Sequence, residues 1–182
     1  RLILVRLFMS RRELVVPDYG LRRLARGKVA EVLTKAYDSE RRRAMVNLGA
    51  PEDQTQKLVN CILDGSYIQA HVHNGEHPKW ESFTLLYGGP LGVFTFMSDG
   101  RIAGVELLTL DDLRTIIIEP NIYHCAMALE PSVVLEVLDQ PYDESTHKKM
   151  ASWGPSEDAS PDKIIQHMGK LRSYMIARNV RA

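Results

Sequence analysis

The sequence has few cysteines and no excess of charge of either sign. Among its 182 residues there are two cysteines, Cys61 and Cys125, and the formal net charge at pH 7 is zero. Two cysteines are too few for a disulfide framework, and both lie in apolar runs, where a buried free thiol is the usual occupant. The neutral balance gives no support to a basic nucleic-acid-binding surface. We therefore expect a cytoplasmic protein that does not bind nucleic acid.

Long hydrophobic runs are also lacking. The opening stretch, residues 2–8, is apolar but is interrupted by Arg6, whereas a membrane-spanning helix needs about 20 apolar residues. No small-residue cleavage site follows this stretch, so we do not interpret it as a signal peptide. We expect no membrane association. The sequence begins with Arg1 rather than Met, and it therefore does not decide whether a targeting segment precedes it.

The charges are unevenly distributed along the chain. The first 50 residues hold twelve basic against five acidic residues, and the remainder holds eleven against eighteen. This asymmetry predicts an attraction between the N-terminal segment and the rest of the domain, in the same chain or in a second copy. Apolar spacing predicts a helix over residues 17–37. We interpret the run Arg41-Arg42-Arg43 as the solvated end of that helix, with a phosphate site as the alternative.

From residue 57 to residue 138, short apolar runs alternate with turn residues. Eight runs of this kind without an intervening helix predict an antiparallel barrel or sandwich. Farther on, Ser160-Pro161 predicts the start of a C-terminal helix, whose apolar stripe we expect to dock on the body, with partner binding as the alternative. The predicted strands are residues 58–63, 67–73, 80–87, 91–97, 102–108, 115–119, 123–129 and 133–138.

Three histidines and a glutamate are the residues that indicate chemistry. In a strand over residues 67–73, alternation places His71 and His73 on one face. An antiparallel return brings Glu81 beside them, and His124 opens a later strand. A single strand histidine is usually a hydrogen-bonded polar residue, but three imidazoles and one carboxylate from adjacent strands form a recurring metal site. We predict one divalent first-row ion, which is Fe, Mn, Ni, Co, Zn or Cu.

Four further residues are candidates for a substrate pocket beside that ion. Tyr67 and Gln69 share the predicted strand face of the two histidines, and Phe83 shares the face of Glu81. Glu136 lies in the apolar run 133–138. A buried carboxylate needs a partner, so Glu136 either lines the pocket or faces water on an outer face.

These residues resemble a known family. The pattern Gly65-x5-His71-x-His73-x7-Glu81-x6-Gly88 is similar to the first cupin motif. In the second motif, Leu113, Glu119, Asn121 and Ala128 stand where most cupins have Gly, Pro, Gly and Asn, and Asn121 tolerates the left-handed turn that is needed there. Over residues 39–155 the chain also resembles the WbuC-type cupin fold metalloproteins. That likeness rests on Arg41-Arg42-Arg43, Gly65-Ser66-Tyr67, Lys79-Trp80-Glu81, Ala128-Leu129-Glu130-Pro131, Glu136 and Pro141-Tyr142-Asp143.

The resemblance implies a mainly β fold, with a single cupin jelly-roll barrel, an N-terminal helix and a C-terminal helical extension. We divide the chain into an N-terminal strand and helix segment (1–56), the barrel (57–140) and a C-terminal loop and helix (141–182). The resemblance also implies that His71, His73, Glu81 and His124 are the metal ligands. It further implies a bacterial setting near polysaccharide-assembly genes.

The expected function follows from the metal site. The first hypothesis is a metalloenzyme acting on a small polar substrate such as a sugar or sugar-derived acid, of isomerase, epimerase or oxygenase type, linked to polysaccharide biosynthesis. The alternative is a non-catalytic cupin that the metal stabilises for small-molecule binding or for a structural role, and a regulatory partner protein is a third. We also expect a homodimer, because Ile68, Val72 and Trp80 alternate away from the metal face and need cover. The sequence does not decide whether the chain is an enzyme.

Overall fold

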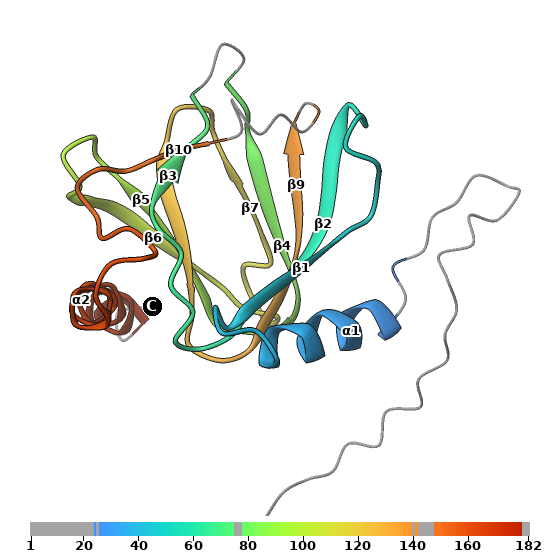
Figure 1. Cartoon of the computed structure of the whole chain (residues 1–182), viewed down its shortest axis with the longest axis horizontal. Helices are drawn as coiled ribbons and strands as arrows, with labels where there is room; N and C mark the ends of the chain where they lie inside the picture. The colour runs from blue at the N-terminus through green and yellow to red at the C-terminus, as the bar shows by residue number, and fades with distance from the viewer. Residues whose placement is uncertain (1–23, 25, 75–77, 140, 142–147, 180–182) are drawn as a thin grey trace, which may run out of the picture.

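The computed structural model describes residues 24, 26–74, 78–139, 141 and 148–179. Figure 1 shows strands arranged as an open-ended barrel, with one helix beneath it and another beside it. In the described part of the chain the elements are α1 (Arg26–Tyr37), β1 (Arg43–Asn47), β2 (Thr55–Ile62), β3 (His71–Val72), β4 (Glu81–Gly88), β5 (Leu91–Phe96), β6 (Ile102–Leu108), β7 (Thr115–Ile118), β8 (Tyr123–Ala128), β9 (Ser132–Asp139), β10 (Lys149–Met150) and α2 (Pro161–Asn179).

The strands form two five-stranded antiparallel sheets. The first has the order β1-β2-β9-β4-β7 and the second the order β10-β3-β8-β5-β6. Chain neighbours such as β3 and β4 belong to different sheets, so the chain repeatedly crosses from one sheet to the other. This is the double-stranded β-helix, or cupin, architecture, and it confirms the predicted mainly β fold with an N-terminal and a C-terminal helix.

Side chains that alternate inward from both sheets form the core. Leu85 pairs with Val134 in the first sheet and Leu91 pairs with Leu108 in the second, and all four are buried in one cluster. In a β-strand, successive side chains point to opposite faces. The apolar residues between these positions therefore face outward and require a second cover, which the helices provide.

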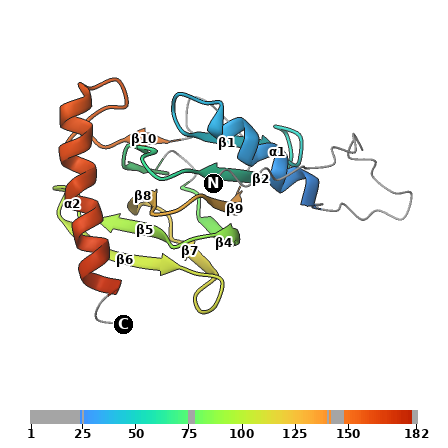
Figure 2. The ribbon, with the colours of Figure 1, turned by 90° about the horizontal axis from the view of Figure 1, so that it is seen from below.

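Each helix covers the outer face of one sheet (Figure 2). Val32 and Ala36 of α1 pack with Cys61 of β2, and Leu171 and Met175 of α2 pack with Cys125, Phe94 and Phe96 of the second sheet. A Cβ atom on Gly92 would lie 2.6 Å from Sδ of Met175, so this glycine lets α2 approach the sheet closely. Both cysteines are buried free thiols, and burial raises the pKa of Cys61 to about 11 and that of Cys125 to about 12.

The arginine run departs from the predicted helix end. Arg43 belongs to β1, a strand that we did not predict, and its guanidinium donates to the carbonyl oxygen of Tyr67. Arg41 and Arg43 both form ion pairs with Glu157, at 2.8 and 2.5 Å. The run therefore joins the start of β1 to the loop before α2.

The strand predicted over residues 67–73 is also shorter than expected, since only His71–Val72 is paired. The carbonyl oxygen of Ala70 accepts a hydrogen bond from the amide of Ala151, outside the strand ladder.

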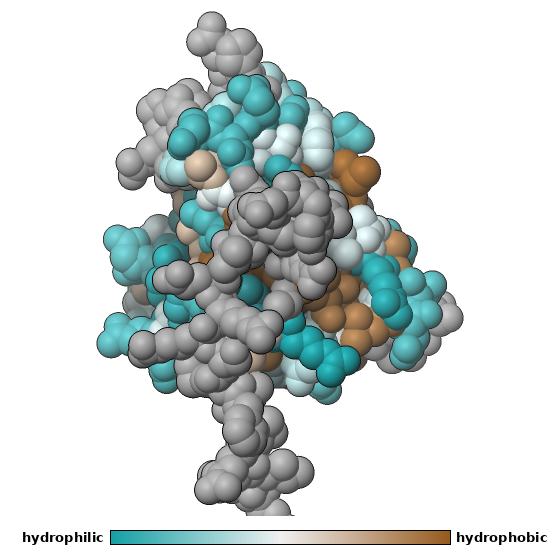
Figure 3. Space-filling model, turned by 90° about the vertical axis from the view of Figure 1, so that its right-hand side faces the viewer, coloured by the Kyte–Doolittle hydropathy of each residue, from teal (hydrophilic) through white to brown (hydrophobic). Residues whose placement is uncertain are grey.

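No helix among the described residues is long and apolar enough to cross a bilayer. On the side of the molecule seen in Figure 3, hydrophobic residues gather next to hydrophilic ones.

Candidate metal centre

Four side chains from three strands converge at one end of the barrel. His71 lies on β3 directly opposite His124 of β8, and His73 follows just after β3. Glu81 is the first residue of β4 and comes from the other sheet. The turn before β8 contains Asn121 in the left-handed conformation that we expected, with φ of 67°. The sequence-predicted ligands are therefore brought together.

The distances between these side chains suit a shared ion. Oε2 of Glu81 lies 2.9 Å from Nε2 of His73 and 3.0 Å from Nε2 of His124. The ring centroids of His71 and His124 are 4.5 Å apart. One ligand atom from each of the four residues lies within 4.8 Å of all the others. Donors of one first-row ion are each about 2.1 Å from it, and hence about 3 to 4 Å from one another.

Backbone carbonyls orient two of the imidazoles. Nδ1 of His71 lies 3.0 Å from the carbonyl oxygen of Gln69, and Nδ1 of His124 lies 2.9 Å from that of Ile122. A carbonyl oxygen only accepts, so Nδ1 carries the proton in both rings. When a ring protonated at Nδ1 is neutral, its Nε2 carries a lone pair that can bind a metal, and protein carbonyls commonly fix metal-binding histidines in this tautomer.

The protonation states also fit metal binding. Burial lowers the pKa of His71 to about 3, so this ring is neutral at neutral pH. Burial alone would raise the pKa of Glu81, but hydrogen bonds from His124 and His73 outweigh burial and hold it well below its usual range. Burial opposes the charged form of His124 as well, yet the bond to the Glu81 carboxylate raises its pKa. A cation is thus favoured beside Glu81, and a metal ion can replace the proton there.

Two of the predicted pocket residues lie next to this group. Phe83 and Glu136 are paired across β4 and β9 on the inner face, one inward position away from Glu81. The carboxylate of Glu136 accepts a hydrogen bond of 3.1 Å from the amide of Asn60. Burial, reinforced by the negative charge of Glu81, raises the pKa of Glu136 well above its usual range. Sequence reasoning missed Asn60, although a polar residue at an inward position of an apolar strand was the available signal.

The other two pocket candidates have different surroundings. The amide of Gln69 is buried and donates to the carbonyl oxygen of Ala151 at 2.9 Å. The hydroxyl of Tyr67 donates to the carbonyl oxygen of Pro155, and its ring meets His167 of α2 edge-on. Tyr67 therefore lies beside α2 and not beside the four donors, because residues 67–70 do not continue the alternation of β3.

The remaining histidines do not join the donor group within the described structure. His167 is half-buried against Tyr67, and burial lowers its pKa. His77 and His147 lie outside the described residues.

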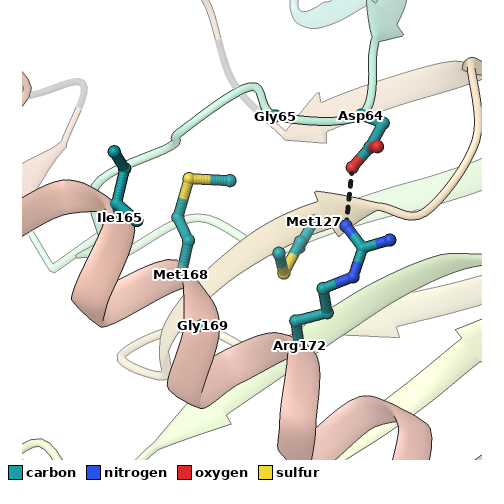
Figure 4. A pocket seen from close by; sticks show the side chains of 7 residues that line it. All are labelled: Asp64, Gly65, Met127, Ile165, Met168, Gly169 and Arg172. Atoms are coloured by element: carbon teal, nitrogen blue, oxygen red, sulfur yellow. Dashed lines mark hydrogen bonds and ion pairs between the residues drawn. The ribbon is translucent and has the colours of Figure 1, made fainter. Parts of the chain in front are cut away.

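A separate hollow of about 300 Å³ lies between α2 and the turn after β2 (Figure 4). Arg172 crosses it to form an ion pair of 3.0 Å with Asp64. Met127 lines its floor and packs in the cluster beneath α2, on the outer face of the second sheet. The hollow is therefore distinct from the metal centre inside the barrel.

Comparisons with known proteins agree with the fold. A family model described as "Domain of unknown function (DUF6016)" matches residues 24–108. A structure of the capsular polysaccharide assembling protein CapF from Staphylococcus aureus is 20% identical, with a TM-score of 0.51 over 62% of this chain and 32% of that one. A second CapF structure is 18% identical, with a TM-score of 0.50 over 58% of this chain and 29% of that one.

A third solved structure has a lower TM-score. It is an uncharacterized conserved protein with a double-stranded beta-helix domain from Klebsiella pneumoniae, 17% identical, with a TM-score of 0.45 over 60% of this chain and 84% of that one. No curated protein matches this chain. At these identities the CapF structures show the fold alone, and the chain spans 32% or less of their length. None of these matches names the WbuC-type family, so the narrower resemblance stays a prediction.

Proposed function

We propose that the protein is a metal-dependent enzyme that acts on a small polar substrate such as a sugar or a sugar-derived acid. The observation that carries this proposal is a second carboxyl group near the centre, which is not one of the groups that hold the ion. Glu136 lies on the strand next to that of Glu81, on the same inner face, and is held by Asn60. It is not one of the four clustered donors.

Each polar side chain around the centre has a distinct role in this proposal. His71, His73, Glu81 and His124 hold the ion, which would supply Lewis acidity that polarises a carbonyl or hydroxyl oxygen of the substrate. Glu136 gives or takes a proton at the substrate, and Asn60 keeps its carboxyl group oriented. Phe83 forms an apolar wall beside them. Proton movement of this kind suits an isomerase or epimerase, and an oxygenase remains the other reaction type.

The alternative is a non-catalytic cupin in which the metal only stabilises the barrel. Such a protein needs four ligands and a packed core around them, and it has no use for a further acid. An inward-facing carboxyl group costs free energy even with a hydrogen-bonding partner, because it loses its hydration. An acid retained at that cost beside the ion favours catalysis over a structural role.

The carbohydrate part of the proposal has a separate basis. The CapF structures that share this fold are described as those of a capsular polysaccharide assembling protein. Together with the WbuC-type resemblance, this favours sugars and sugar-derived acids as the first compounds to screen.

The test compares Glu136→Gln with Glu119→Gln, a matched change at an exposed position. Metal content is measured by mass spectrometry, and turnover is measured on the sugar or sugar acid that most increases the melting temperature. We expect both variants to keep their metal. Glu136→Gln should lose about 10²- to 10⁴-fold in turnover, as is typical when a general acid or base is removed. Unchanged turnover in Glu136→Gln would contradict the catalytic proposal.

We also propose that the protein forms a homodimer, but the structure changes the residues on which this proposal rests. Val72 is buried and Ile68 packs against the core within one chain, so neither needs cover from a partner. The exposed hydrophobic side chains are others, including Ile117 of β7 and Met45 of β1. Light scattering at micromolar concentration tests this, and a single 20.6 kDa species would contradict it.

A further inference from the structure

We propose that the metal centre takes an anionic small molecule, and that Lys148 binds its carboxylate or phosphate group at the opening of the barrel. The inference rests on the proposed function, because it names the substrate class of the same site. It is argued from the strand register, from the exposure of Lys148 and from a second, buried lysine.

The register of β10 places Lys148 on the face of the histidines. Lys149 pairs with Val72 and Met150 pairs with His71 in the antiparallel ladder. Continuing that register brings Lys148 opposite His73. Because strand side chains alternate, Lys148 shares the face of the two histidines, whereas Lys149 shares the opposite face with Val72.

Lys148 is exposed, although the histidines that share its strand face are buried. Lys148 thus stands where a molecule from solution meets the centre.

A second lysine lies near the start of β4. Lys79 precedes Glu81, the first residue of that strand, by two residues, and it is 5% exposed. Its ammonium group donates to the carbonyl oxygen of Pro141 at 2.9 Å. Among the residues that the structure describes, no carboxylate forms an ion pair with Lys79 or Lys148.

These charges favour an anion. A divalent ion held by neutral imidazoles and one carboxylate keeps an excess positive charge, and the two lysines add to it. Burying an ammonium group is costly because it loses hydration, and a nearby anion lowers that cost. Lysine presents a compact point charge on a flexible stem, which suits a single carboxylate or phosphate group.

The test measures binding of pyruvate and of inorganic phosphate to the metal-loaded protein by calorimetry, with glucose as the uncharged comparison. The variants are Lys148→Gln, Lys148→Arg and the matched neighbour Lys149→Gln. We expect Lys148→Gln to weaken binding of the preferred anion about tenfold, as for loss of one charge-assisted hydrogen bond. Lys148→Arg should restore most of that loss, and Lys149→Gln should change binding less than twofold. Metal content should be equal in all four proteins.

Each other outcome is decisive. Equal anion binding in Lys148→Gln and Lys149→Gln overturns the inference, as does a protein that binds glucose but neither anion, or none of the three at millimolar concentration. Preference for pyruvate or for phosphate tells which anionic group the site takes. If the protein retains no metal after loading but its anion binding still depends on Lys148, the anion contact of Lys148 is supported while the proposed metalloenzyme is contradicted.

Discussion

The two halves of the barrel interior differ in chemistry although the same strands build both. In β4, Glu81 reaches the metal centre while Leu85, two inward positions farther on, lies in the hydrophobic core. In β9, Glu136 and Val134 differ in the same way. Alternation thus decides whether a side chain faces inward or outward. The position of an inward side chain along the strand decides whether it lies in the site or in the hydrophobic core. The apolar half holds the strands in register so that the polar half can keep four donors in place.

The largest effect is expected from a variant that removes donor side chains from the polar half of the barrel interior. Replacing both His71 and His73 with Ala should reduce bound metal from one ion per chain to background, because two of the four donors are lost. The hydrophobic half is untouched, so the far-ultraviolet circular dichroism should keep its β signal. Metal content measured against His167→Ala is the check. Unchanged metal content in the double variant would show that the ligands lie elsewhere.

The second prediction disturbs the apolar half. Leu85→Ala should lower the free energy of unfolding of the metal-free protein by about 2 to 5 kcal/mol, since a buried leucine leaves a cavity. Urea denaturation measures this, and the folded variant should still bind one ion. The matched change Ile117→Ala, on the neighbouring strand β7 but exposed, should cost less than about 0.5 kcal/mol. Equal losses in the two variants would contradict the proposed division of the interior.

The last prediction concerns pH, and its effect within one pH unit is the smallest of the three. In the metal-free protein the pKa of His71 is lowered by burial to about 3, so between its ordinary value and that value the unfolded chain binds a proton at this ring that the folded chain does not. The contribution of His71 to stability therefore falls as the pH falls through this window, by at most about 1.4 kcal/mol per pH unit. The variant His71→Asn should show a shallower fall in urea denaturation. Identical pH profiles would mean that His71 is not buried as a neutral ring.

The strands and the clustering of the four donor side chains were accessible from the sequence because both depend on local patterns. Turn residues separate the strands, and β6 has the predicted bounds of Ile102–Leu108. His71 and His73 are one strand repeat apart, so a single correct strand places both.

Other features depend on contacts between distant segments. β1 was missed because it forms by pairing with β2, and no pattern within residues 43–47 reveals that pairing. Tyr67 was assigned to the pocket by extending β3 backwards, but its carbonyl is bonded to Arg43 and its hydroxyl to Pro155. The contact of Asn60 with Glu136 joins residues from different strands, and only the sheet register reveals it.

Glu81 is the one donor of the four that comes from the first sheet, while the three imidazoles belong to the second. An ion held by all four is therefore a cross-link between the sheets at the end of the barrel that the hydrophobic core does not close. Because its donors come from both sheets, we expect loss of such an ion to accompany separation of the sheets at this end. That separation would also expose the amides of β3 to hydrogen exchange. The residence time of the metal and the protection of His71 and Val72 are then expected to change together.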